Sequence, residues 1–405
     1  MLDIKDFQTL TRYTDSKILM LVIDGLGGLP HLQSAKTELE SANIPNLDKL
    51  THESTTGVAI PIQHGITPGS GPGHMSLFGY NPIKYVIGRG VLEAVGSGIK
   101  LANKDIAIRG NFCTINNQGM ITDRRAGRIS DNNATKLIKR LSQIKIDGID
   151  ITIKHLKSHR FVLVLRGPDL NTDITPTDPL LNNLPINHAN ANSPKSKKTA
   201  TLINKFTQLS LDILKNEPRA NAIVLRGFSQ KPSIPNIGHT FHLNPIGISL
   251  YPAYRGIADI LGMKVTDQGE DFSDLIKVVR NNFNDFNFFY LHYKDTDSAG
   301  EDGDFDKKVF SLEKLDTFIP ELQSIGFDVI TIAGDHSTPS VLSSHSWHPV
   351  PILINSNIPT SDKSRHFTEL ECKNGDIGQI YSTDIMPITL AHANKLIKFE
   401  PNTPL

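Results

Sequence analysis

The sequence predicts an α/β protein in which one domain, built from both ends of the chain, carries a smaller inserted α/β domain. Both ends alternate strand-like and helix-like segments, whereas the middle of the chain has a different character. Three near-continuous apolar runs in the two ends are typical of buried parallel strands; they cover residues 17–23, 288–292 and 329–333. We place the outer domain at residues 1–100 and 245–405 and the inserted domain at residues 101–244.

Acidic residues follow each of the three runs. Asp24 follows the first, Asp297 and Glu301 lie in the segment after the second, and Asp335 and His336 follow the third. In open α/β sheets the ligand site lies beyond the carboxyl ends of the strands, so these residues can converge although they are far apart in sequence. Several carboxylates in one place are tolerable only around cations. The strand ends therefore predict a metal site.

Two histidines near these acids are interpreted differently. Asp335 and His336 are followed by His345, and carboxylate with imidazole suits Mn²⁺ or Zn²⁺. Alone, this segment fits a capped helix start and a surface histidine equally well; the other strand-end acids favour the metal site. His292 lies inside the second run, and we expect it to be a buried, hydrogen-bonded histidine rather than a ligand.

Ser70 is the candidate nucleophile. It stands between two glycines ahead of a short predicted helix at residues 75–79. Backbone N–H groups at a helix start stabilise an anion, and glycines let a substrate approach closely. A serine hydroxyl needs a base or a metal to become reactive, and a Gly-Ser-Gly segment alone is more commonly a simple turn. We expect His74 to support this loop.

The middle of the chain is rich in arginine. Three short apolar runs, at residues 106–110, 162–167 and 222–227, each end in Arg-Gly. If they are neighbouring strands, three guanidiniums project from one edge, and guanidinium fits phosphate and carboxylate. These candidates are Arg109, Arg166 and Arg226, joined by Arg124 and Arg128 of the segment 123–128. Residues 171–198 read as a surface loop and residues 199–215 as a helix.

Composition excludes several classes of protein. Lys and Arg together number 42, and so do Asp and Glu, so a net charge of zero argues against general binding to nucleic acid or a membrane surface. Cys113 and Cys372 are the only cysteines, which excludes a disulfide framework and a thiolate zinc site and favours a cytoplasmic location. The run at residues 17–23 is too short to span a bilayer. Nothing in the sequence indicates an oligomeric state.

Several motifs together carry a resemblance. They are residues 22–25 (Val-Ile-Asp-Gly), 66–74 around Ser70, 88–94 beginning Gly-Arg-Gly, 123–128 (Asp-Arg-Arg-Ala-Gly-Arg), 334–339 beginning Gly-Asp-His, and His345 ahead of 349–351. The chain resembles the archaeal-type cofactor-independent (2,3-bisphosphoglycerate-independent) phosphoglycerate mutases of the alkaline phosphatase superfamily. The resemblance implies a three-layer α/β/α domain with an inserted smaller domain, and a small phosphorylated three-carbon acid as substrate.

The resemblance also implies roles for individual residues. Ser70 would carry the phosphoryl group between 3-phosphoglycerate and 2-phosphoglycerate, and Asp123 would be the acid/base between the glycerate hydroxyls. Two divalent ions, Mn²⁺ or Mg²⁺ with Zn²⁺ or Co²⁺ as alternatives, would be needed, and 2,3-bisphosphoglycerate would not. The first ion would lie among Asp24, Ser70, Asp335 and His336, and the second among Asp297, Glu301 and His345. Substrate would be held by Arg109, Arg124, Arg128, Arg166, Arg226 and Arg255.

Three features depart from the family pattern. One is a pair of turns after the middle strands, where residues 168–171 and 228–229 replace the glycine-rich turns expected there, and the other two are single positions. Glu301 stands where the family usually has His, which predicts a preference for Mg²⁺ or Mn²⁺ over softer metals. Arg255 stands where the family usually has Lys. These departures keep two alternatives open: a metal-dependent phosphatase or phosphonate-processing hydrolase of the same superfamily, and a catalytically impaired relative. The arginine-rich inserted domain favours a mutase, because a hydrolase need not retain its alcohol product.

Overall fold

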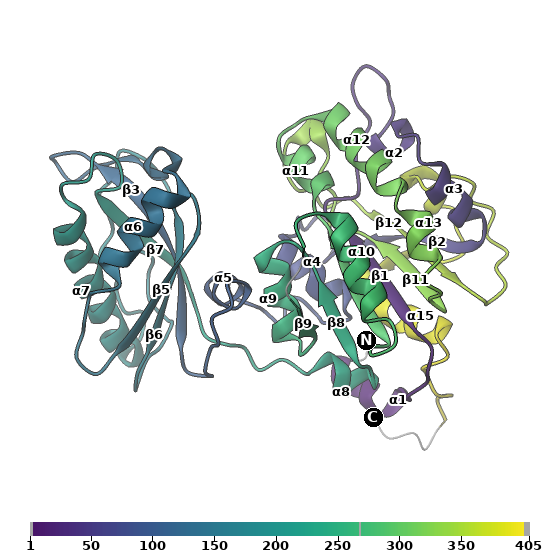
Figure 1. Ribbon diagram of the computed structural model, residues 1–405, viewed down its shortest axis with the longest axis horizontal. Coiled ribbons are helices and arrows are strands. Elements are labelled where there is room, and N and C mark those ends of the chain that lie inside the picture. Colours follow the sequence, from purple (N-terminus) through teal and green to yellow (C-terminus); the bar gives the residue numbers. More distant parts are fainter. Residues whose placement is uncertain (1–2, 267–268, 401–405) are drawn as a thin grey trace. The chain divides into compact units, whose positions relative to one another are not determined.

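The chain forms two compact units in the computed structural model, which describes residues 3–266 and 269–400 (Figure 1). The first unit contains Met1–Val86 and Ile234–Leu405, and the second contains Ile87–Ser233. The predicted borders, at residues 100/101 and 244/245, fall further along the chain than these. The predicted α/β class is confirmed, since each unit has its own sheet with helices packed on it.

The first unit is organised around an eight-stranded sheet in the order β13-β2-β12-β11-β1-β10-β8-β9. β1 pairs in parallel with both β10 and β11, as the apolar runs predict. β12 is antiparallel to both of its neighbours, β11 and β2. The strands are β1 (Ile18–Ile23), β2 (Ser54–Ile60), β8 (Pro245–Ile248), β9 (Lys264–Val265), β10 (Phe288–Tyr293), β11 (Val329–Ala333), β12 (Val350–Ser356) and β13 (Gly378–Tyr381).

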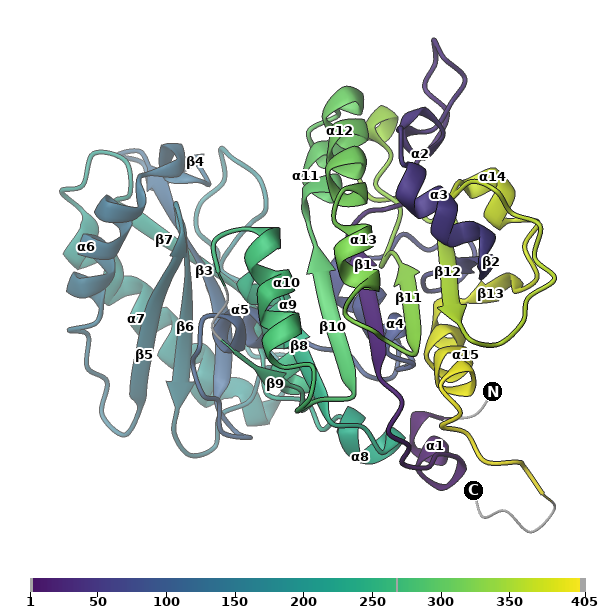
Figure 2. The same cartoon turned by 45° about the vertical axis from the view of Figure 1, so that its right-hand side comes forward.

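Helices cover both faces of this sheet, which explains why every residue of β1 is buried (Figure 2). Leu19 and Leu21 pack into a core with α10, whose apolar residues recur at helical spacing. On the opposite face, Thr331 hydrogen-bonds Thr389 of α15. Helices on the first face are α2 (Glu38–Ser41), α3 (Pro45–His52), α10 (Phe272–Asn281), α12 (Phe305–Asp316), α13 (Ile319–Gln323) and α14 (Glu369–Cys372); those on the other are α4 (Ser70–Leu77), α9 (Pro252–Ile260) and α15 (Ile385–His392).

Short helices complete the first unit, and within the described residues no helix combines the length and apolar character needed to cross a membrane. The predicted helix at residues 75–79 overlaps α4, which begins earlier, at Ser70, and already ends at Leu77. The remaining segments are α1 (Phe7–Leu10), α8 (Ile237–Phe241) and α11 (Asp295–Glu301), and the 3-10 helices η1 (Ile4–Asp6), η4 (Ser340–Leu342) and η5 (Ser382–Asp384).

The second unit is built on an antiparallel sheet. β3 lies between β6 and β7, β5 pairs with β6, and β4 pairs with the end of β3. Helices α6 and α7 pack on one face through a shared apolar core. The elements are α5 (Arg89–Gly96), β3 (Ile106–Ile115), β4 (Ile121–Asp123), η2 (Ala126–Arg128), α6 (Asp131–Leu141), β5 (Asp150–Lys157), β6 (Arg160–Arg166), η3 (Pro194–Ser196), α7 (Lys197–Leu214) and β7 (Ala222–Ser229).

The antiparallel pairing corrects one prediction about the arginines. Arg109 of β3 lies directly opposite Arg226 of β7, as expected. Its partner on β6 is Val162, and β6 runs on past that position to Arg166. The expectation that three Arg-Gly strand ends meet at one edge is therefore wrong for Arg166. Apolar runs identify strands, but they do not reveal the direction in which neighbouring strands run.

Candidate active site

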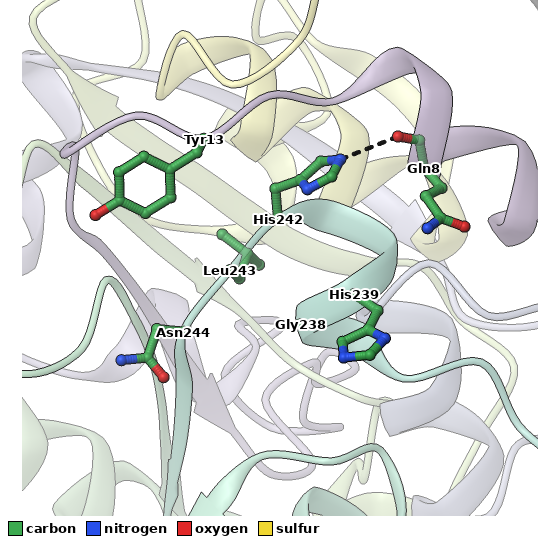
Figure 3. A pocket seen from close by; sticks show the side chains of 7 residues that line it. All are labelled: Gln8, Tyr13, Gly238, His239, His242, Leu243 and Asn244. Carbon is green, nitrogen blue, oxygen red and sulfur yellow. Dashed lines mark hydrogen bonds between the residues drawn. The ribbon is translucent and has the colours of Figure 1, made fainter.

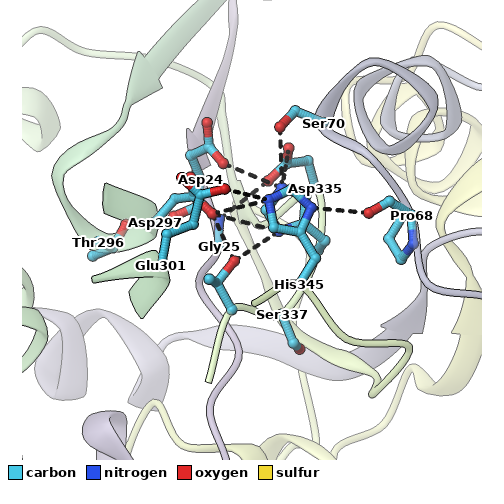
Figure 4. A network of polar contacts seen from close by, with 12 residues as sticks. Asp24, Gly25, Pro68, Ser70, Thr296, Asp297, Glu301, Asp335, Ser337 and His345 are labelled. Carbon is cyan, nitrogen blue, oxygen red and sulfur yellow. Dashed lines mark hydrogen bonds and ion pairs between the residues drawn. The ribbon is translucent and has the colours of Figure 1, made fainter. Parts of the chain in front are cut away.

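The predicted metal-site residues of the first unit lie together at the carboxyl ends of three parallel strands (Figure 4). Asp24 follows β1, Asp297 lies in α11 after β10, and Asp335 and His336 follow β11. Their ligand atoms form two groups, in each of which all atoms lie within 4.8 Å of one another. One group is Asp24, Asp335 and His336, and the other is Asp297, His336 and His345.

Buried carboxylates dominate the electrostatics of the site. Burial opposes ionisation of Asp24, but the charge of Lys294 and a hydrogen bond with His292 outweigh it and hold the Asp24 pKa well below its usual value. Burial and Asp24 also oppose ionisation of Asp335, yet its pKa is lowered because His336 and His74 lie beside it. The pKa of Asp297 is raised by burial and by the charge of Asp24.

Two buried oxygens show that the site fits a cation. Asp24 Oδ1 and Asp335 Oδ2 have no hydrogen-bond partner among the described residues, although buried polar atoms are nearly always hydrogen-bonded. Both oxygens face the same imidazole nitrogen: His336 Nε2 lies 3.4 Å from the first and 3.2 Å from the second. Carboxylate oxygens converging on an imidazole nitrogen form a donor set that suits Mn²⁺ or Zn²⁺, so these residues fit a divalent metal.

Ser70 opens α4 beside this group. Gly69 is the N-cap of α4, and Ser70 Oγ lies 3.2 Å from His336 Nε2. Gly73 allows the close approach of α4, because a Cβ there would lie 2.3 Å from the carbonyl oxygen of Asp335. The hydroxyl therefore stands at a helix N-terminus, where backbone N–H groups favour negative charge.

His74 supports the serine loop, as the sequence predicts. Its Nδ1 lies 2.8 Å from the carbonyl oxygen of Ser70 and 3.1 Å from Asp335 Oδ2, so one ring nitrogen ties the loop to a metal-site carboxylate. Burial opposes protonation of His74, but the charge of Asp335 outweighs it and raises the His74 pKa.

His345 joins the second group through one nitrogen. Its Nδ1 lies 2.9 Å from the carbonyl oxygen of Pro68, which can only accept, so Nδ1 carries the proton. Nε2 is thereby directed towards Asp297 Oδ1 at 3.5 Å and Glu301 Oε1 at 3.4 Å. A hydrogen bond fixing one ring nitrogen while the other faces a metal position is common in metal sites.

Glu301 is the most accessible of the predicted ligands. Its side chain is 56% exposed, against 18% for His345. It lies outside the two tight groups and reaches the site through its contact with His345, which lowers the Glu301 pKa. Glu301 in turn affects His345. Burial opposes protonation of His345, but the hydrogen bond with Glu301 is among the contacts that raise the His345 pKa to about 9.

Lys294 is a residue of the site that the sequence patterns did not single out. Lys294 Nζ donates to carboxylate oxygens of both Asp24 and Asp297. His292 is buried, as predicted, and its Nε2 lies 3.1 Å from Asp24 Oδ2. A lysine directly after a buried strand and next to acidic residues is the signal that marks Lys294. Arg255, predicted to bind substrate, donates to the backbone carbonyls of Ser249 and Leu250.

The second unit gathers positive charge around β3. Burial lowers the pKa of Arg109 to about 10, with Arg89, Arg160 and Arg226 contributing and Glu93 opposing. The Nε atoms of Arg109 and Arg226 are buried and make no hydrogen bond among the described residues, although Arg226 Nε lies 3.5 Å from Asp178 Oδ2 and Arg109 lies 3.6 Å from Glu93. Buried guanidinium N–H groups without hydrogen bonds suit an anion. Arg160 begins β6, and the antiparallel pairing brings it opposite Asn111 of β3, so it enters the cluster that Arg166 was predicted to join.

Arg124, Arg166 and Asp123 make hydrogen bonds or ion pairs within the second unit. Arg124 makes two hydrogen bonds with Asp178, at 2.9 and 2.7 Å. Arg166 pairs with Asp105 at 2.7 Å. Asp123 accepts backbone N–H groups of Arg125 and Gly127, at 2.8 and 2.6 Å, and so closes the loop that carries Arg128. That loop turns tightly, since Ala126, Gly127 and Arg128 all have positive φ.

A separate cavity of about 350 Å³ opens elsewhere in the first unit (Figure 3). Asn244, which lines it, directly precedes β8, whereas the candidate active site follows the other ends of parallel strands. Its other lining residues are Gln8, Tyr13, Gly238, His239, His242 and Leu243. His242 Nε2 lies 3.1 Å from the carbonyl oxygen of Gln8. This cavity is therefore no part of the metal-site cluster.

Comparison with known sequences adds independent findings. A family model described as 2,3-bisphosphoglycerate-independent phosphoglycerate mutase matches residues 51–220. A Thermus thermophilus protein named a probable 2,3-bisphosphoglycerate-independent phosphoglycerate mutase is 42% identical over 395 residues, covering 96% of this chain and 97% of the relative. A Thermotoga maritima protein of the same name is 45% identical over 386 residues, covering 95% and 96%.

Solved structures agree with these matches. The PH0037 protein from Pyrococcus horikoshii superposes with a TM-score of 0.82 at 27% identity, covering 95% of this chain and 99% of that one. The cofactor-independent phosphoglycerate mutase from Thermoplasma acidophilum superposes with a TM-score of 0.72 at 28% identity, covering 93% and 100%.

Proposed function

We propose that this protein interconverts 3-phosphoglycerate and 2-phosphoglycerate through a phosphoserine at Ser70. The chain belongs to the 2,3-bisphosphoglycerate-independent phosphoglycerate mutase family, and it is therefore an isomerase. One observation carries the proposal. The Ser70 hydroxyl lies 3.2 Å from His336 Nε2, and His336 is the residue shared by both groups of metal-type ligands. The candidate nucleophile and both groups therefore meet at the His336 ring, with Ser70 beside Nε2 and Asp297 beside Nδ1.

The residues of the first unit fit two divalent ions. Asp24, Asp335 and His336, with Ser70, would hold one, and Asp297, Glu301 and His345 would hold the other. Bound metal would supply charge stabilisation for the attacking and leaving oxygens. Mg²⁺ and Mn²⁺ suit the carboxylate-rich set, and the added carboxylate of Glu301 strengthens that preference.

Phosphoryl transfer then requires two steps at Ser70. In the first, Ser70 Oγ, which has lost its proton to solvent and which bound metal would stabilise as the alkoxide, bonds to phosphorus while the bond from phosphorus to the 3-oxygen of glycerate breaks and that oxygen takes a proton from Asp123. The N–H groups of the first turn of α4 stabilise the negative charge of the phosphoryl oxygens. In the second, the 2-oxygen of glycerate attacks phosphorus and the bond to Oγ breaks. We assign the proton exchange between the two glycerate hydroxyls to Asp123.

A mutase must also retain glycerate while the phosphoryl group is on serine. The arginines of the second unit suit this task, because glycerate has a carboxylate and the buried Nε donors of Arg109 and Arg226 make no hydrogen bond within the described residues. Arg89 and Arg160 add positive charge to the same cluster. A phosphatase has no need for such a cluster, and this distinguishes the two functions.

Phosphorus NMR of the protein with 3-phosphoglycerate and Mn²⁺ tests the proposal. We expect a 2-phosphoglycerate signal with the natural protein and none with Ser70→Ala. Ser76→Ala is the matched control, because Ser76 lies on the same helix but donates to the Pro72 carbonyl oxygen instead. Inorganic phosphate as the main product would show that the protein is a hydrolase and not a mutase. Unchanged turnover in Ser70→Ala would show that the reaction does not pass through a phosphoserine at this residue.

A further inference from the structure

Lys294 joins the two groups of metal-type ligands. Its Nζ donates to Asp24 Oδ2 at 2.9 Å, to Asp297 Oδ2, and to Tyr254 Oη at 3.0 Å. An ammonium has three donors, so these three acceptors satisfy it completely. The side chain is 15% exposed. Lys294 is therefore a built-in part of the site rather than a surface lysine that happens to reach it.

The two aspartates divide their oxygens between Lys294 and the histidines. Asp24 turns Oδ2 to Lys294 and Oδ1 to His336, whose Nε2 is 3.4 Å away. Asp297 likewise turns Oδ2 to Lys294 and Oδ1 to His345, whose Nε2 is 3.5 Å away. Lys294 can thus keep its contacts while the oxygens that face the imidazoles bind a metal.

Packing holds the lysine in this position. The Tyr254 ring stacks on His292 with centroids 3.8 Å apart, and Lys294 Nζ lies 5.4 Å from the centre of the Tyr254 ring. His292 Nε2 shares Asp24 Oδ2 with the lysine. Lysine side chains are flexible, but the stacked rings of Tyr254 and His292 hold Lys294 at a defined distance from the carboxylates of Asp24 and Asp297.

A count of formal charges shows what the lysine changes. Asp24, Asp297, Glu301 and Asp335 contribute −4 and Lys294 contributes +1, which gives −3. Two divalent cations then give −3 + 4 = +1, whereas the same site without the lysine charge would be neutral. The lysine charge opposes the metal ions and attracts a phosphate dianion, because all of these charges lie within a few ångströms in a largely buried site.

We propose that Lys294 is a fixed cation of this site, which weakens the binding of divalent metal and strengthens the binding of phosphate to the metal-loaded protein. The proposal rests on the metal-dependent function proposed above. It makes Lys294 a positioning residue that also sets the charge of the site. Its two effects have opposite signs, and a lysine needed only for packing would not produce that pattern.

Titration calorimetry on Lys294→Met and Lys294→Gln tests this. Mn²⁺ is titrated into chelator-treated, dialysed protein, and inorganic phosphate is titrated into Mn²⁺-saturated protein. In both variants we expect Mn²⁺ to bind about tenfold more tightly and phosphate about tenfold more weakly. Glutamine retains hydrogen-bond donors without the charge, so a Gln variant that behaves like the natural protein would overturn the charge role.

The control is Lys314→Met. Lys314 is 3.6 Å from Asp295, which lies on the same helix as Asp297, but its side chain is 48% exposed. Lys314→Met should change neither the affinity for Mn²⁺ nor the affinity for phosphate. Circular dichroism and melting temperatures check that every variant is folded. Weaker binding of both probes, or no change in either, in Lys294→Met would overturn the inference. Failure of the natural protein itself to bind Mn²⁺ would instead contradict the metal-dependent function, and the inference with it.

Discussion

The two units of the protein each concentrate charge of one sign, and they differ in how that charge is balanced. In the first unit, buried aspartates contact His74, His292, His336 and Lys294 of the same unit, and two of their oxygens make no hydrogen bond to any residue that the structure describes. In the second unit, Arg109 and Arg226 lie opposite each other with buried Nε donors that make no hydrogen bond within the described residues. The first unit is thus suited to cations and the second to an anion.

Removing one carboxylate from the first unit should have the largest effect. We expect Asp335→Asn to lower turnover of 3-phosphoglycerate by about a thousandfold or more and to abolish measurable tight Mn²⁺ binding, since the change removes a charge beside His74 and His336 at nearly constant shape. Steady-state kinetics and calorimetry measure both. Asp302→Asn, an exposed carboxylate beside Lys307, is the control. Equal losses in the two variants would contradict a specific role for Asp335.

Removing positive charge from the second unit should change the product. We expect Arg226→Met to raise KM about tenfold to a hundredfold, which corresponds to one lost charged hydrogen bond, and to increase the fraction of inorganic phosphate released. Arg166→Met provides the matched comparison, because Arg166 ends a similar strand but pairs closely with Asp105, at 2.7 Å, whereas Arg226 lies 3.5 Å from Asp178. Product ratios from phosphorus NMR decide the matter. If Arg166→Met is the more harmful change, the arginine cluster has been assigned wrongly.

Metal preference should respond more modestly. Glu301→His replaces a hard carboxylate by an imidazole next to His345, so we expect activity with Zn²⁺ or Co²⁺ relative to Mg²⁺ to increase about tenfold. Metal titrations of activity and of binding provide the measurement. Asp302→His introduces a histidine at the neighbouring exposed position and should leave the ratio unchanged. A natural protein that already works equally well with soft and hard metals would argue against this role of Glu301.

The smallest effect is a dependence of stability on pH in the second unit. Burial and the neighbouring arginines lower the pKa of His159 to about 4, whereas an unfolded histidine titrates near 6.5. Between these values the unfolded chain binds more protons, so His159 lowers stability as pH falls through this window and has no effect above it. Between pH 7 and pH 5 the melting temperature of the natural protein should therefore fall further than that of His159→Gln, with a difference of about a degree or two.

His188→Gln is the control for this prediction, because His188 is an exposed histidine of the same unit. Calorimetric melts of the full chain at both pH values provide the comparison. Identical pH dependence in the natural protein and His159→Gln would mean that the positive cluster does not act on His159.

Much of the fold and of the candidate site could be predicted because the signals are local. Continuous apolar runs identified β1, β10 and β11, and an acidic residue after each marks the ligand edge of a parallel sheet. The glycines around Ser70 mark a tight approach that the structure explains through Gly73 and Asp335. The apolar runs do not reveal the direction in which neighbouring strands run. For this reason Arg166 was predicted to lie beside Arg109, whereas the antiparallel pairing of β3 and β6 places Arg160 near Arg109 instead.

By itself the sequence determined which residues can ionise, ligate or attack, and which segments must be buried, because residue type and apolar periodicity depend only on near neighbours. Tertiary structure alone decided which of those groups share an environment. It placed Lys294 between Asp24 and Asp297, and it directed His345 Nε2 inwards through the Pro68 carbonyl. Charge and hydrogen-bond energies depend on distances between atoms, and residues far apart in sequence acquire those distances only when the strands pair.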